Sequence, residues 1–132
     1  MHQKKHFYTL KATERLKHRK KIDALFTAGQ KFSLGEIRVV YHTTQAEEQA
    51  GLLLGVGVSK RYFKKAVDRN LIKRRLREAI RLSKLDFLPI VKEAGLNLDL
   101  FILYTSKEIP CFDHCLELVQ AAVKKLARKL KP

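Results

Sequence analysis

The sequence predicts a single α+β domain whose elements follow the order α-β-β-β-α-β-α, arranged as a sandwich. Three observations favour this class. The chain has 132 residues, of which 45% are hydrophobic, and this size suits one domain with its own core. Its central segments alternate apolar and polar residues or form short apolar runs, as strands do. The segments around them repeat apolar residues at helical spacing, so helices should cover a small sheet.

The N-terminal half predicts an arm, a helix and the first strands. Residues 1–15 carry many charges and few large apolar groups, which indicates a mobile basic arm before a domain spanning residues 16–132. Residues 17–28 predict a short amphipathic helix that Gly29 ends. Residues 36–43 alternate with β-branched residues and predict a strand, with a short partner near residues 31–33.

The remaining elements are predicted from changes in the spacing of apolar residues along the chain. Residues 51–58 form an apolar, glycine-containing run that predicts a central strand, and a hairpin with residues 36–43 is the simplest arrangement. A helix is expected over residues 65–83, with a second, shorter helical piece over residues 87–93 before Gly95. Residues 98–104 then predict a buried strand, and residues 111–130 an amphipathic helix. The sequence shows no internal repeat and no low-complexity linker.

The charge of the chain predicts a polyanionic partner. The 28 Lys and Arg residues outnumber the 13 Asp and Glu residues and give a formal charge of +15, which suits nucleic acid or an anionic membrane surface. No stretch reaches the roughly 18 apolar residues of a spanning helix, and residues 1–21 lack the apolar core of a signal peptide. We therefore expect a cytoplasmic protein. A membrane-surface role is weaker, because the large apolar groups are needed for the core.

The most informative segment is residues 58–84, with eleven basic residues against two acidic ones, a local charge of +9. At 100° per residue, one side of the predicted helix carries cations and an asparagine, and the other carries apolar residues. An ordinary solvated face usually mixes signs to gain ion pairs, whereas this one is nearly all positive and rich in arginine, whose planar group suits phosphate. The segment predicts binding to RNA backbone without base specificity. The cationic side comprises Asn70, Lys73, Arg74, Arg77 and Arg81, and the apolar side Leu71, Ile72, Leu76, Ala79 and Leu82.

Other chemistry finds little support. Cys111, His114 and Cys115 lie within five residues, but they lack the paired spacing of a structural zinc site, so we expect reduced, unliganded thiols and no metal held by the protein. The acidic residues are scattered rather than clustered as a two-metal nuclease requires. No glycine-rich phosphate loop occurs.

The same basic segment resembles the signature of the bacterial ribonuclease P protein, written R-N-x-[IV]-K-R-x-x-R-[EQ]. The resemblance extends from about residue 14 to residue 128 and is most specific over residues 55–81. Between Ser59 and Ala66 the chain is one residue longer than many members, and Ile22 stands where the family often has an aromatic residue. The matching residues are Arg69, Asn70, Ile72, Lys73, Arg74, Arg77 and Glu78, with Gly55, Val58, Ser59, Lys60, Ala66, Val67, Arg15, Leu16, Phe26 and Gly29 upstream.

The resemblance implies a ribosomal protein S5 domain 2-like fold with a left-handed β-α-β crossover. It also implies an accessory subunit of a ribonucleoprotein endoribonuclease, in which the catalytic RNA and its bound Mg²⁺ cut the 5′ leader from precursor tRNA. The implied partners are that RNA and precursor tRNA, with no membrane and no DNA. The alternative is a ribosomal or architectural RNA-binding protein, which would share the basic helix but lack a leader cleft. Residues expected to bind the catalytic RNA are Lys60, Arg61, Lys64, Lys65, Arg69, Asn70, Lys73, Arg74, Arg77 and Arg81.

A cleft between the first helix and the sheet is implied for the single-stranded leader. Phe26 matches a cleft aromatic of the family directly, whereas Tyr41 matches only if one residue is inserted after Gly29. Whether Tyr41 or Val40 faces the cleft stays open. Core packing is an equal alternative for both aromatic residues, because half-buried rings can serve both purposes.

Overall fold

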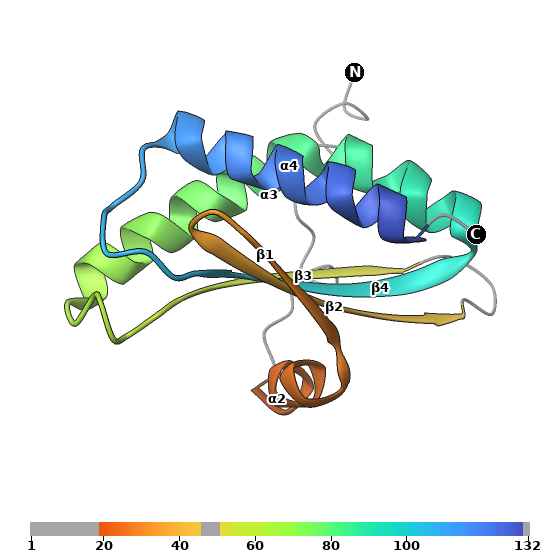
Figure 1. Ribbon diagram of the computed structural model, residues 1–132, viewed down its shortest axis with the longest axis horizontal. Coiled ribbons are helices and arrows are strands. Elements are labelled where there is room, and N and C mark those ends of the chain that lie inside the picture. The colour runs from red at the N-terminus through yellow and green to blue at the C-terminus, as the bar shows by residue number, and fades with distance from the viewer. Residues whose placement is uncertain (1–18, 46–50, 131–132) are drawn as a thin grey trace, which may run out of the picture.

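The computed structural model describes residues 19–45 and 51–130, so the predicted arm over residues 1–15 lies outside it. Within these ranges the elements follow the predicted order, and the chain folds as a mixed α+β domain (Figure 1). The predicted short partner strand before residues 36–43 is confirmed. The elements are α2 (Arg19–Ala28), β1 (Gln30–Leu34), β2 (Ile37–Gln45), β3 (Leu52–Val58), α3 (Ala66–Ala94), β4 (Leu96–Tyr104) and α4 (Phe112–Leu130).

The strands form one sheet in the order β1-β2-β4-β3. β1 and β2 pair antiparallel, as do β2 and β4, whereas β3 and β4 are parallel. The predicted hairpin of residues 36–43 with residues 51–58 is therefore wrong, and β3 is an edge strand, not a central one. The reason lies in β4, which carries buried apolar residues on both of its faces, such as Leu100 and Phe101, and so takes a central position.

Helices cover the two faces of the sheet unequally. Figure 1 shows α3 and α4 lying across one face and α2 against the other. The main core lies beneath α3 and α4, and residues that alternate along the strands, including Ile37, Val39, Leu100 and Ile102, are at most 1% exposed there. A smaller cluster lies on the α2 side, with Leu25, Val40 and Phe101 buried and Ile22, Phe26, Leu53 and Leu103 packed around them.

α3 is one continuous helix of 29 residues, so the expected break between residues 83 and 87 is wrong. Pro89 lies inside it and cannot donate a hydrogen bond to the carbonyl of Leu85. Both residues are exposed, so water can bond that carbonyl, while Val91, two residues after Pro89, is 1% exposed in the core. The helix ends at Gly95, whose left-handed φ of 63° lets its N–H reach the last carbonyls.

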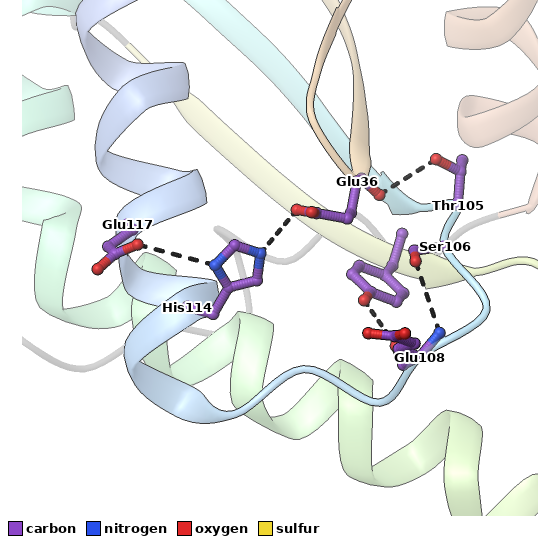
Figure 2. A network of polar contacts seen from close by, with 7 residues as sticks. Glu36, Thr105, Ser106, Glu108, His114 and Glu117 are labelled. Atoms are coloured by element: carbon purple, nitrogen blue, oxygen red, sulfur yellow. Dashed lines mark hydrogen bonds and ion pairs between the residues drawn. The ribbon is translucent and has the colours of Figure 1, made fainter.

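Polar contacts tie the start of α4 to the β1–β2 turn (Figure 2). The Glu36 carboxylate lies 2.7 Å from His114 Nε2, and the Thr105 N–H and hydroxyl both donate to the Glu36 carbonyl, at 2.8 and 3.1 Å. The Tyr104 hydroxyl donates to the Glu108 carbonyl at 2.6 Å. The hydrogen bond with Glu36 raises the pKa of His114. These contacts fix the loop that joins β4 to α4.

Candidate nucleic-acid interface

The exposed side of α3 carries the predicted cations. Asn70, Arg74 and Arg77 are exposed and Lys73 is half-buried, while the predicted apolar side packs into the core through Ile72, Leu76 and Ala79. Lys73, Arg74 and Arg77 have no hydrogen-bond or ion-pair partner within residues 19–45 and 51–130. Their charges are therefore available to an external anion. We call these three residues with Asn70 the α3 cation face.

Two predicted residues of this helix differ from the expectation. Leu82, assigned to the apolar side, is 39% exposed, since it lies at the edge of the packed arc. Arg81 forms an ion pair with Glu78 one turn earlier, and this hydrogen bond lowers the pKa of Glu78. Part of the Arg81 charge is thus balanced within the helix.

The loop before α3 is held in place from both sides. Phe63 is 6% exposed in the core, where its ring lies 6.4 Å from that of Tyr104. Arg69, in the first turn of α3, donates from Nη1 to the carbonyls of Phe63 and Lys64 at 2.7 and 2.8 Å. Arg69, predicted to bind RNA, therefore has a structural contact that orients the loop. The cations that the loop exposes are Lys60, Arg61, Lys64 and Lys65.

On the opposite face of the sheet, Phe26 of α2 packs against Phe101 of β4. Their ring centroids are 5.2 Å apart in an edge-to-face arrangement, and Phe26 remains half-buried. Val40 lies in the same cluster. Tyr41 instead belongs to the main core on the other face, where it is 4% exposed and its hydroxyl donates to Gln30 Oε1 at 2.7 Å. Val40, not Tyr41, therefore faces α2, and the placement removes Tyr41 from this surface.

Phe101 is the residue that the sequence reasoning missed. Its ring lies over Gly57 of the neighbouring strand, where an added Cβ would come within 2.7 Å of Phe101 Cζ. Gly57, which has no side chain, thus makes room for the large ring of Phe101. The strand pattern could have predicted this position, because Phe101 lies between Leu100 and Ile102 on one strand and therefore points to the opposite face of the sheet.

Cations stand beside this apolar surface. Arg38 lies two residues before Val40 on β2, and Lys31 of β1 pairs directly with Val40 in the sheet, so both project on the α2 side. Both are exposed. Aromatic groups beside cations are the combination that binds single-stranded nucleic acid, since bases stack on rings and phosphates meet charges. We call Phe26, Arg38 and Lys31, together with the buried Val40 and Phe101 against which Phe26 packs, the α2-side surface.

The candidate metal ligands near the start of α4 are separated by burial. Cys111 is exposed, whereas Cys115 is buried, and burial raises the pKa of Cys115 to about 11, which disfavours the thiolate that binds metals. His114 is engaged by Glu36. In the described part of the chain, no three His, Cys, Asp or Glu side chains are grouped to hold a metal ion. No helix of the same part is long and apolar enough to cross a membrane.

Comparison with known proteins shows which family the chain resembles. The family model for ribonuclease P matches residues 10–130. The ribonuclease P protein component of Porphyromonas gingivalis is 31% identical over 120 residues, which cover 91% of this chain and 88% of the relative. That of a Picosynechococcus species is 31% identical over 114 residues, covering 83% and 90%.

Solved structures agree on the fold. The RNase P protein of Staphylococcus aureus superposes with a TM-score of 0.65 at 22% identity, covering 89% of this chain and 98% of that one. The RNase P protein of Thermotoga maritima gives 0.65 at 22% identity, covering 85% and 96%. The match over nearly the whole length, together with the signature residues on α3, shows that this chain belongs to the ribonuclease P protein family, whose members are the protein component of an endoribonuclease complex that processes tRNA.

Proposed function

We propose that this chain binds the catalytic RNA of a bacterial ribonuclease P and the 5′ leader of precursor tRNA, and so assists removal of the leader. The observation that carries the proposal is the α3 cation face within a chain of this family. Three cations there lack any partner in the described residues, and one helix fixes their spacing. The loop cations before α3 extend the same positive surface.

Binding by the α3 cation face is electrostatic. Each phosphate that a cation neutralises releases condensed counterions, so affinity falls steeply as salt rises. Arginine adds paired hydrogen bonds to phosphate oxygens, and Asn70 can bond to sugar or phosphate. Because Arg69 and Phe63 hold the loop, Lys64 and Lys65 meet the RNA from a fixed position at little entropic cost.

The α2-side surface suits the leader. The half-buried ring of Phe26 can meet unpaired bases, and the buried ring of Phe101 supports it from below. Arg38 and Lys31 project from the same sheet face, where they can meet the backbone. A leader of variable sequence requires this kind of contact, because stacking accepts every base. A ribosomal or architectural RNA-binding protein would not need an aromatic surface on the far side of the sheet from its basic helix.

The protein supplies binding, and in this proposal the RNA supplies the chemistry. Mg²⁺ ions held mainly by RNA would activate the water and stabilise the leaving oxygen. The chain's own cations screen phosphate repulsion between the two RNAs, which lowers the Mg²⁺ concentration that assembly needs.

Reconstitution tests the proposal. The chain is added to protein-free ribonuclease P RNA, and precursor cleavage is followed at low Mg²⁺. We expect cleavage at the mature 5′ end to become faster by more than tenfold, and high Mg²⁺ to reduce the difference. Unchanged cleavage with a folded chain would contradict the proposal and favour an architectural role.

A further inference from the structure

A second basic site lies along α4 at the β1 edge of the sheet, away from both surfaces described above. It is a groove of about 550 Å³ between the C-terminal half of α4 and strand β1. Four of its six lining residues are cations, and no acidic residue lines it. The lining residues are Leu34, Ala121, Lys124, Lys125, Arg128 and Lys129.

The spacing of these cations is unfavourable for the helix alone. Lys124 and Arg128 are four residues apart, as are Lys125 and Lys129, and like charges at this spacing repel on a helix surface. The helix dipole favours cations in the last turn, which accounts for Arg128 and Lys129. It does not account for Lys124 and Lys125 in the turn before. An external anion would relieve the repulsion of both pairs.

Two of these lysines, Lys125 and Lys129, lie near the same aromatic ring. Lys125 Nζ lies 4.9 Å and Lys129 Nζ 5.7 Å from the ring centroid of Phe32 on β1. Phe32 is itself only 8% exposed, so the ring is fixed by the core. The ring attracts both ammonium groups but carries no net charge to neutralise them. Two cations are thus positioned in advance, which lowers the entropic cost of binding an anion.

The groove lies at the opposite edge of the molecule from the α3 cation face. β1 and β3 are the two edge strands of the sheet, and α3 packs over β3 while α4 reaches β1. Both helices nevertheless cover the same sheet face, whereas α2 lies on the other (Figure 1). A ligand in the groove is therefore separate from one on the α2-side surface, but it shares the helical layer with α3.

We propose that this groove binds the phosphate backbone of a second segment of the catalytic RNA, so that the protein joins two parts of one RNA. The inference rests on the proposed function. The groove suits the phosphate backbone, because four of its six lining residues are cations, none is acidic, and contacts of cations to phosphate do not depend on base sequence. The shared helical layer favours the catalytic RNA over precursor tRNA, whose leader is assigned to the opposite side of the sheet.

The test removes the two groove cations that make no contact with Phe32. In the variant Lys124→Gln/Arg128→Gln, we expect affinity for catalytic RNA to fall on the order of 10-fold at physiological salt, with a salt slope smaller by about 2. The matched control is Lys92→Gln/Lys107→Gln, two exposed cations outside the groove, which should bind as the unmodified chain does. The variant Lys124→Arg/Arg128→Lys keeps the charge and should retain the slope. Thermal unfolding of each variant checks folding.

The outcomes separate this inference from the proposed function. If the groove variant binds catalytic RNA with unchanged affinity and slope while Arg74→Ala/Arg77→Ala weakens binding, the groove inference is wrong and the proposed function stands. If the assembled holoenzyme instead loses affinity only for precursor tRNA, the groove binds tRNA and the assignment to catalytic RNA is overturned. If the unmodified chain does not bind catalytic RNA, both proposals are wrong.

Discussion

The α3 cation face draws Lys73, Arg74 and Arg77 from five consecutive residues of one helix, whereas the α2-side surface joins Phe26, Val40 and Phe101 from three elements. On α3, each charge acts largely alone, and removing one leaves the helix and its core contacts in place. On the α2 side, Phe26, the ring that would meet a ligand, packs against the buried Val40 and Phe101. We therefore expect binding and stability to be separable on α3 and coupled on the α2 side.

The largest expected effect tests that coupling through Phe101. Because its ring is 6% exposed between Phe26 and Gly57, Phe101→Ala should lower the free energy of unfolding by about 3 kcal/mol through lost burial and a residual cavity. Urea denaturation measures the change. Tyr62→Ala, at a ring that is 37% exposed, is the control and should cost less than about 1 kcal/mol. If Phe101→Ala lowers the free energy of unfolding as little as Tyr62→Ala does, the α2-side cluster contributes little to stability.

The next effect should be on binding alone. Arg74→Ala/Arg77→Ala removes two exposed charges without a partner in the described residues, so affinity for catalytic RNA should fall by about 10-fold or more and the salt slope should decrease by about 2. The unfolding midpoint should stay within about 2 °C. Binding titrations at several salt concentrations measure both quantities. The control Lys92→Ala/Lys107→Ala removes the same amount of charge elsewhere on the chain. If the control loses as much affinity, the loss on α3 is explained by the net charge of the chain and not by the position of the two arginines.

The smallest effect concerns the contact between Glu36 and His114. The pKa of His114 is raised, so the contact stabilises fully below the ordinary pKa of about 6.5 and its contribution is lost as pH rises through the raised value. His114→Gln should therefore lower stability more at pH 6 than at pH 9. Both side chains are more than a third exposed, so solvent screening keeps the difference below about 1 kcal/mol. Glu36→Gln should remove most of the same pH dependence, because Glu36 is the main cause of the raised pKa and Glu117, 3.7 Å from His114 Nδ1, contributes the remainder. An undiminished pH dependence in this variant would show that Glu36 is not the partner responsible.

The order of elements and the two sides of α3 could be predicted because both depend on local periodicity. The arrangement of the sheet could not, since the position of β4 between β2 and β3 depends on pairing between distant segments. The choice between Val40 and Tyr41 needed the strand's register, because a shift of one residue exchanges the two faces. The structural contact of Arg69 was also hidden, because a sequence shows its charge and not the carbonyls that it meets.

The central claim is that the two surfaces meet different RNAs, and one measurement tests it most directly. Holoenzyme is assembled with Phe26→Leu, a change that keeps an apolar group against Phe101, and its affinities for precursor tRNA and mature tRNA are compared with those of the unmodified holoenzyme. A base-aromatic stack contributes about 1–3 kcal/mol, so precursor affinity should fall about fivefold or more while mature tRNA affinity stays the same. Equal losses for the two tRNAs in a folded variant would contradict the claim and leave Phe26 a packing residue.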